Sequence, residues 1–365
     1  MKRLAQLRAH AVERSLFPPT TLVRALDALG FVQADPIRAP ARAQDLTLRL
    51  RVMDYRAGDL ERRYPTLAIE EDVLINYGFV TREVQALMHP RAGAALLPTA
   101  RNTRAQALLA FIRERGTAHP REVDARFSPG TVTNYWGGSS SATTRLLEAM
   151  HYKGLLRIAR REAGIRIYAV HQHDPGPTGA AARRRCIDAL VDVVVRKYAP
   201  LPAASLSFVV GRLRYAVPQW RNELPAALAR AKHRLAHEQV DGHVWYWPAD
   251  DTLSSREQSD TVRLLAPFDP VVWDRRRFEL LWGWAYRFEA YTPVAKRKLG
   301  YYALPLLWRD RVIGWGNVSI TDGALHTDIG YVAGRPPRGR AFTQALEEEL
   351  NRMRAFMTRG RSTVE

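Results

Sequence analysis

The sequence predicts an α+β fold in which three tandem helical units, each ending in a β-hairpin, precede a C-terminal β-barrel-like domain. The order helix, helix, helix, hairpin occurs between residues 102 and 170 and again between residues 180 and 247. From about Thr261 the pattern changes to β-branched and aromatic runs separated by turns. We expect domains over residues 1–98, 99–174, 175–255 and 256–365.

The N-terminal unit begins with two helices and a short extended segment. Apolar spacing predicts one helix over 4–15 and a second, capped by Thr20 or Thr21, that ends at Leu29, where Gly30 supplies a left-handed C-cap. The other elements expected here are helices over 42–52, 55–64 and 81–89 and a hairpin or buried strand over 69–80. If this unit is a degenerate copy of the next two, the chain holds three such units in tandem.

The second and third units have the element order of a winged helix. In the second unit we expect helices over 106–115, 120–127 and 140–155 and a hairpin formed by 156–160 and 165–170. After a Pro/Gly-rich joint at 174–179, the third unit has helices over 180–198, 202–210 and 218–236 and a hairpin over 239–247. In DNA-binding winged helices the third helix enters the major groove and the wing meets phosphate or the minor groove.

The C-terminal region is predicted to form a small sheet or partly closed barrel. The expected strands are 261–266, 286–291, 301–308, 312–320 and 324–331, and the expected helices are 275–282 and 340–357.

Composition favours a nucleic-acid partner. The chain has 365 residues and a formal net charge of +18, and surplus positive charge is the usual footprint of phosphate-backbone binding. No apolar run is long enough for a membrane span, and the N-terminus lacks the apolar core of a signal peptide. Cys186 is the only cysteine, which is typical of a reducing compartment. We therefore expect a cytoplasmic protein that binds nucleic acid and no membrane.

The stretch that follows the second helix carries the most suggestive chemistry. In an extended segment, Gln33 and Asp35 lie two residues apart and present an amide and a carboxylate on one face. Arg38 and Arg42 follow just beyond Pro36. Such a pair can hold a water molecule or oppose a developing positive charge. It can equally be a capped turn, because Asp before Pro often satisfies nearby backbone N–H groups.

Signals for cofactor chemistry are weak. His171 with His173, and His233 with His237, have suggestive spacing, but neither pair has an obvious third ligand. No Walker-type loop and no strand-borne Gly-x-Gly-x-x-Gly is present. We expect no metal and no other cofactor.

Two stretches resemble the AlkZ/YcaQ-type bacterial DNA glycosylases, tandem winged-helix proteins that remove alkylated bases and unhook interstrand crosslinks. One stretch runs from Leu29 to Asp35 and continues through Arg42-Ala43 and residues 51–55. The other runs from Leu264 to Asp269 and continues through residues 286–291 and 293–302. The resemblance covers nearly the whole chain and implies three winged helices and a C-terminal β-barrel. It also implies a nucleoid-associated protein whose partner is double-stranded DNA carrying alkylated bases, and we expect a monomer.

The resemblance also assigns roles. The family's catalytic motif is Gln-x-Gln or Gln-x-Asp, so Gln33 and Asp35 place this chain in the YcaQ-like branch. Where YcaQ-like members have a His-rich run after Arg-Ala, this chain has Gln44-Asp45-Leu46, a departure that we expect to alter the DNA-facing rim and the lesion range. The expected DNA contacts are Arg38, Arg42, Gln44, Arg49, Arg51, Arg145, Arg160, Arg161, Arg166, Lys296, Arg297 and Lys298.

The implied reaction is hydrolysis of the N-glycosidic bond of an alkylated purine. An N7-alkylated purine is already cationic and leaves without a general acid, so what remains is to stabilise an oxocarbenium-like sugar and position water. Asp35 supplies the charge or the base, and Gln33 holds the water. No lysine lies next to the motif in sequence, which favours a monofunctional glycosylase. The alternative is a non-catalytic winged-helix DNA-binding protein, a regulator or lesion binder.

Overall fold

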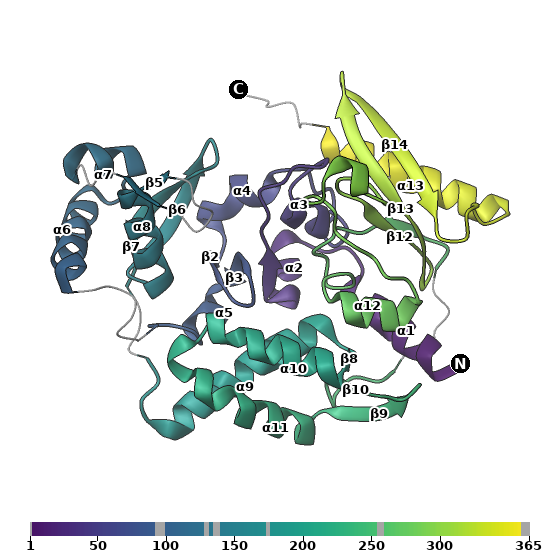
Figure 1. Cartoon of the computed structure of the whole chain (residues 1–365), viewed down its shortest axis with the longest axis horizontal. Helices are drawn as coiled ribbons and strands as arrows, with labels where there is room; N and C mark the ends of the chain where they lie inside the picture. Colours follow the sequence, from purple (N-terminus) through teal and green to yellow (C-terminus); the bar gives the residue numbers. More distant parts are fainter. Residues whose placement is uncertain are drawn as a thin grey trace. The chain divides into compact units, whose positions relative to one another are not determined.

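The computed structural model describes residues 2–91, 99–127, 131–133, 139–172, 176–253 and 259–358 (Figure 1). The chain divides into two compact units. The first consists of Met1–Leu60, Val191–Val210 and Leu228–Glu365, and the second of Glu61–Leu190 and Gly211–Ala227. The predicted boundaries at residues 98, 174 and 255 lie outside the described residues, and the four-domain division stays a prediction.

The first unit begins with α1 (Lys2–Ser15), α2 (Leu22–Leu29), β1 (Phe31–Gln33) and α3 (Ala43–Leu48). Both predicted caps of α2 are present: Thr21 accepts a hydrogen bond from the Arg24 backbone N–H, and Gly30 is left-handed with φ 61°. The helix predicted over 42–52 is shorter than expected. The chain leaves it because the Arg51 carbonyl oxygen accepts a hydrogen bond from Thr20 N at 2.9 Å, in a parallel β-bridge that Thr20 forms with Val52.

The middle of the chain supplies helices to both units and a small sheet to the first. The elements are α9 (Gly179–Tyr198), β8 (Leu201–Pro202), α10 (Ala203–Arg212), α11 (Leu224–Arg234), β9 (Ala236–Val240) and β10 (His243–Trp247), with 3₁₀ turns at Leu213–Tyr215 and Pro218–Glu223. The strand order is β8-β10-β9. The turn between β9 and β10 is formed by Asp241 and Gly242, both with positive φ, so the predicted Asp-Gly hairpin is confirmed.

The C-terminal sheet of the first unit is open within the described residues. Its strands β11 (Val262–Leu264), β12 (Leu304–Trp308), β13 (Arg311–Thr321) and β14 (Ala324–Tyr331) pair antiparallel in chain order. Helices α12 (Arg275–Trp282) and α13 (Arg340–Met357) have the predicted bounds, and α13 lies along the sheet (Figure 1). The prediction of a partly closed barrel is therefore not confirmed.

The strand predicted over 286–291 is wrong, because its aromatic residues pack individually. The Tyr286 hydroxyl donates to the Ala303 carbonyl at 2.7 Å, and the Phe288 ring packs against Phe268 and Tyr302 at 5.2 Å between centroids. Aromatic residues that fill a core produce the same composition as a strand. The core around them joins α1, α12 and β12 and contains Val12, Leu16, Leu50, Leu265, Val271, Val272, Phe278, Tyr286, Ala303, Leu307 and Val312.

The second unit contains helices, two antiparallel strand pairs (β2–β3 and β4–β5) and the hairpin predicted as a wing. Its elements are β2 (Ile69–Val73), β3 (Tyr77–Thr81), α5 (Arg82–Ala86), α6 (Thr99–Arg115), α7 (Pro120–Phe127), β4 (Thr131–Thr133), β5 (Ser139–Ser141), α8 (Ala142–Lys153), β6 (Leu156–Glu162) and β7 (Ile165–Val170). Helix α4 (Asp59–Arg63) and the 3₁₀ turn Tyr64–Thr66 lead into it. The order α6, α7, α8, β6, β7 is the predicted helix, helix, helix, hairpin.

Candidate active site

The Gln33–Asp35 segment is the end of a strand followed by a tight turn. After β1, Asp35 Oδ1 accepts a hydrogen bond from Ile37 N at 2.9 Å, which is an Asx turn. The Asp35 backbone N–H donates to Gln44 Oε1 at 3.3 Å. The turn-capping alternative is thus part of the structure, but it uses only one carboxylate oxygen. Within the described part of the chain, Asp35 Oδ2 accepts no hydrogen bond.

The surroundings of Asp35 favour its neutral form more than water does. The side chain is half-buried. Burial raises the pKa of the Asp35 carboxyl above its usual value, and the hydrogen bond from Ile37 N opposes this shift. A carboxylate with a raised pKa is a better proton acceptor than an ordinary aspartate, which suits a general base.

Trp273 orients the Gln33 side chain. The Trp273 indole Nε1 donates to Gln33 Oε1 at 2.9 Å. Because an indole N–H can only donate, the oxygen end of the amide faces Trp273 and the NH₂ end faces away. The Trp273 ring packs against Tyr198 at 4.9 Å and against the exposed Phe208 at 5.9 Å between centroids. Sequence analysis did not identify Trp273, since nothing local distinguishes it from a packing tryptophan.

A lysine lies close to the motif in space, which the sequence did not indicate. Lys197 is buried on α9, and its ammonium group donates to the backbone carbonyl of Phe31 in β1. Burial, reinforced by the positive charge of Arg51, lowers the pKa of Lys197 to about 7. Because the amine is enclosed and bonded to the backbone, it supports the strand rather than presenting a nucleophile.

A buried ion pair joins the two stretches that carry the family resemblance. The Arg51 guanidinium, with no solvent exposure, donates to both carboxylate oxygens of Asp269 at 2.8 and 3.0 Å and to the carbonyls of Ser15 and Thr47 at 2.7 Å each. Arg49 is likewise paired, at 2.7 Å from Glu349 Oε1. The structure gives no support to DNA contact by Arg49 and Arg51, because both guanidinium groups donate to buried partners inside the protein.

The Gln44-Asp45-Leu46 segment is interior. Gln44, Asp45 and Leu46 are all buried in α3. Asp45 Oδ1 accepts hydrogen bonds from the Tyr55 hydroxyl at 2.7 Å and from Gly58 N at 3.1 Å. Burial of this segment gives no support to a DNA-facing rim here, and DNA contact by Gln44 stays a prediction.

The remaining predicted contacts of the first unit stay accessible. Arg38 is exposed beside the Asx turn, and Arg42 is partly buried at the N-terminus of α3. Lys296 and Lys298 are exposed in the loop before β12, where the Arg297 guanidinium lies 5.0 Å from the centre of the Tyr301 ring. This loop leads directly to Tyr302, whose electrostatic surroundings include Asp35.

In the second unit, the predicted wing arginines are largely neutralised. Arg161 donates to both carboxylate oxygens of the buried Glu71 at 2.7 and 2.5 Å. Arg166 pairs with Glu148 at 3.1 Å. Arg145 is exposed on α8.

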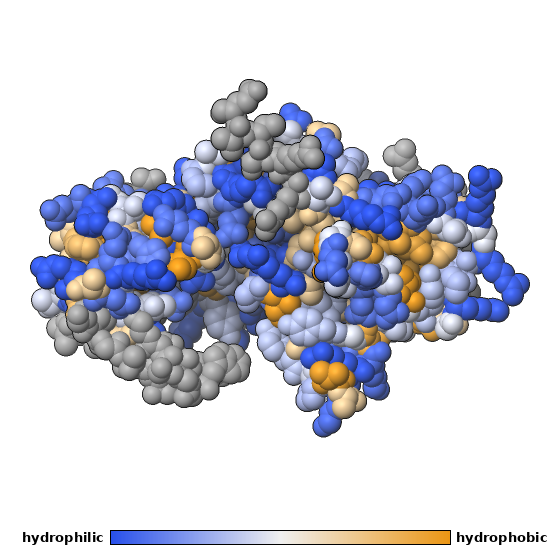
Figure 2. Space-filling view, turned by 90° about the horizontal axis from the view of Figure 1, so that it is seen from above, coloured by the Kyte–Doolittle hydropathy of each residue, from blue (hydrophilic) through white to orange (hydrophobic). Residues whose placement is uncertain are grey.

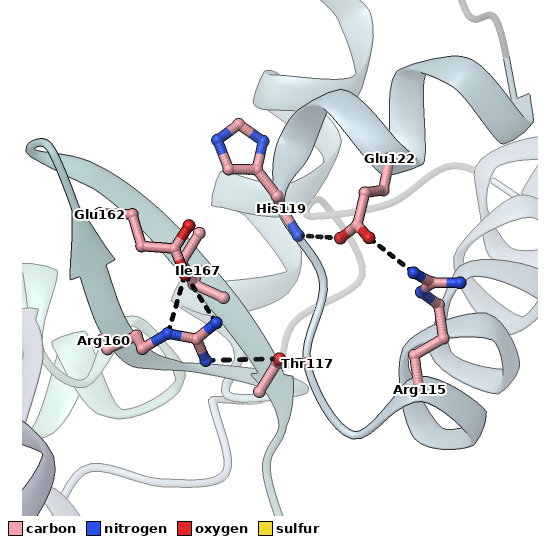
Figure 3. Close-up of a pocket in the computed structure, with 7 residues that line it drawn as sticks. All are labelled: Arg115, Thr117, His119, Glu122, Arg160, Glu162 and Ile167. Carbon is pink, nitrogen blue, oxygen red and sulfur yellow. Dashed lines mark hydrogen bonds and ion pairs between the residues drawn. The ribbon is translucent and has the colours of Figure 1, made fainter.

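Arg160, the fourth predicted contact of this unit, lines a polar hollow of about 490 Å³ (Figure 3). There it is bonded to Glu162 at 2.6 Å, and Arg115 is bonded to Glu122 at the same distance. A second hollow, of about 600 Å³, lies near His89 and Cys186. Neither hollow is lined by Gln33 or Asp35.

The surface of the protein is largely hydrophilic. Hydrophilic residues cover most of the face seen in Figure 2, with hydrophobic residues in scattered spots. Among the described residues, no helix is long and apolar enough to cross a membrane. The described residues contain no cluster of three or more His, Cys, Asp or Glu side chains that could hold a metal. His173, one member of the predicted His171–His173 pair, lies outside the described residues.

Comparisons with known proteins agree with the resemblance. A family model described as DNA glycosylase AlkZ-like matches residues 26–356. Among solved structures, the DNA glycosylase AlkZ of Streptomyces sahachiroi is similar, with a TM-score of 0.63 and 13% sequence identity over 96% of this chain and 96% of that one. At this identity the structural likeness supports the fold, and the family model covers most of the chain. The chain therefore belongs to the AlkZ-like DNA glycosylase family.

Proposed function

We propose that the protein hydrolyses the N-glycosidic bond of N7-alkylated purines in double-stranded DNA. The observation that carries this proposal is the geometry of Asp35. Its half-buried carboxylate has one oxygen fixed by Ile37 N and the other without a hydrogen bond in the described chain. Two residues before it in the chain, the Gln33 amide is oriented by Trp273.

The reaction needs little beyond this pair. The alkylated base carries positive charge, so the C1′–N9 bond breaks with its electron pair moving onto the purine. The carboxylate of Asp35 stabilises the cationic sugar and accepts a proton from the water whose oxygen bonds to C1′. The NH₂ group of Gln33 donates to that water and holds it on the face opposite the leaving base.

We propose that DNA is held by the cationic side chains that remain accessible. These are Arg38, Arg42, Lys296, Arg297 and Lys298 in the first unit and Arg145 and Arg160 in the second. The helix, helix, helix, hairpin runs fit a tandem winged-helix arrangement, in which such residues meet phosphate. Gln44, Arg49, Arg51, Arg161 and Arg166 are assigned to the scaffold instead.

The enclosure of Lys197 supports a monofunctional enzyme, because a lyase step needs an amine that reaches C1′. We further propose that the protein acts as a monomer and that its substrates include N7-alkylguanine and interstrand crosslinks formed through that position.

Incubation with a duplex that contains 7-methylguanine, followed by alkaline cleavage, tests the proposal. A glycosylase leaves abasic sites, so strand breaks are expected only after alkali. Binding to the duplex without breaks after alkali would instead support a non-catalytic DNA-binding protein, in which Asp35 serves only as a turn cap.

A further inference from the structure

Phe208 is an exposed phenylalanine on the outer face of α10. The structure describes all eleven phenylalanines of the chain, and Phe208, at 53%, is the only exposed one. The buried face of the helix includes Leu206, Val209 and Val210, so the core does not need an apolar side chain at residue 208. Single exposed apolar side chains are common, and the importance of this one depends on what its ring contacts.

The Phe208 ring contacts the tryptophan that orients Gln33. The ring centroids of Phe208 and Trp273 lie 5.9 Å apart, with an angle of 32° between the two planes. The indole Nε1 of the same tryptophan donates to Gln33 Oε1 at 2.9 Å. All three residues belong to the first unit, and a single indole separates the exposed ring from the amide. Direct contacts therefore place Phe208 at the edge of the candidate active site.

Trp273 is held in place by the core of the first unit. Its backbone N–H donates to the Asp269 carbonyl at 2.8 Å, and the Asp269 side chain is fixed by the buried ion pair with Arg51. The Tyr198 ring, which is 1% exposed, packs against the indole with 4.9 Å between centroids. Tyr198, Trp273 and Phe208 thus form a series of contacting rings that begins in the core and ends at the surface.

We propose that Phe208 stacks on the alkylated base and favours it for its positive charge. Bases stack on exposed aromatic side chains, and a cation is attracted to the negative face of an aromatic ring. A purine alkylated at N7 is both flat and cationic, so both interactions stabilise its contact with Phe208, whereas an undamaged purine has only the first. The Gln33–Asp35 pair acts on the sugar and the water, so a separate residue is needed to recognise the base. This inference rests on the proposed function, because it takes an N7-alkylated purine as the substrate.

The test compares DNA binding to two duplexes that differ in the charge of one base. One contains 7-methylguanine and the other its neutral analogue 7-deaza-7-methylguanine, each on a 2′-fluoro sugar. The fluorine destabilises the oxocarbenium-like sugar, so the cationic base stays attached while affinity is measured. We expect the wild-type protein to bind the cationic duplex more tightly than the neutral one. Phe208→Leu is expected to lower this preference roughly fivefold, the effect of losing one cation–π contact.

Two further variants are the matched controls. Phe208→Tyr keeps the aromatic face and is expected to keep the wild-type preference for the cationic duplex. Val23 is an apolar side chain of α2 that is 47% exposed, and Val23→Ala is expected to leave the preference unchanged. Because residue 208 is exposed and Leu is a good helix former, Phe208→Leu is expected to melt close to the wild-type temperature.

A Phe208→Leu protein with the wild-type preference for the cationic duplex would overturn the inference. Equal binding of the two duplexes by the wild-type protein, or equal loss of the preference in Phe208→Tyr and Phe208→Leu, would overturn it as well. The binding assay needs no base release, so the inference and the proposed function fail separately. A wild-type protein that prefers the cationic duplex but releases no 7-methylguanine from an unfluorinated duplex would refute hydrolysis and support the stacking contact.

Discussion

Replacing Arg51 by Met tests whether this arginine stabilises the folded protein or contacts DNA. The substitution removes the guanidinium that bonds both oxygens of Asp269 and leaves that carboxylate with no solvent exposure and no countercharge in direct contact. Breaking a buried pair by removing one partner costs about 3–5 kcal/mol. Total stabilities are only about 5–15 kcal/mol, so the loss should be large and easily measured.

The assay is urea unfolding followed by tryptophan fluorescence, which reports mainly on the first unit. Seven of the nine tryptophans belong to that unit. They are Trp245, Trp247, Trp273, Trp282, Trp284, Trp308 and Trp315. We expect the midpoint of Arg51→Met to fall, and the double variant Arg51→Met/Asp269→Leu to lose less stability than the two single variants together, because it leaves no unpaired charge.

The salt dependence of DNA affinity tests the alternative role of Arg51, a contact with DNA phosphate. A phosphate contact contributes about 0.9 to the slope of log affinity against log salt, so removing one lowers that slope. We expect Arg51→Met to keep the wild-type slope at a temperature where it is folded. A variant with the wild-type unfolding midpoint and a reduced salt slope would refute the assignment of Arg51 to the scaffold.

Three other predictions follow from the site. Trp273→Phe removes the donor to the Gln33 amide oxygen and is expected to slow base release roughly tenfold, the effect of about one hydrogen bond, with little change in DNA affinity. An unchanged single-turnover rate would speak against the orienting role. Burial lowers the pKa of Lys197 in the folded protein to about 7. At pH values between this pKa and the higher pKa of the lysine in the unfolded chain, the unfolded chain binds more protons than the folded protein. The contribution of Lys197 to the free energy of unfolding therefore rises with pH in this range, by about 1.4 kcal/mol per pH unit. Lys197→Met should remove that contribution in urea titrations at pH 7.5 and 9, and an unaltered pH dependence would contradict the buried amine. Lys298→Gln is expected to reduce the salt slope of DNA binding by about 0.9, whereas a wild-type slope would exclude Lys298 as a phosphate contact.

Features set by local sequence were predictable. The Thr21 and Gly30 caps of α2 and the Asp241-Gly242 hairpin are present as expected, because each depends on backbone preferences of a few neighbouring residues. The strand end at Gln33 and the turn at Asp35 are also local features, and the catalytic role of the pair stays a prediction.

Features set by distant partners were not predictable. Trp273 bonds to Gln33 across 240 residues, and Arg51 bonds to Asp269 across 218. In the sequence, a buried paired arginine looks the same as an exposed one, so the ion pairs of Arg51 and Arg161 could not be predicted.

The central claim is that the Asp35 carboxylate drives hydrolysis, and Asp35→Asn tests it most directly. Asn keeps an Oδ1 that can accept from Ile37 N, so the Asx turn, the melting temperature and DNA affinity should be retained. The single-turnover release of 7-methylguanine is expected to fall by at least about 10²-fold. Release by Asp35→Asn at the wild-type rate would show that the carboxylate is only a turn cap.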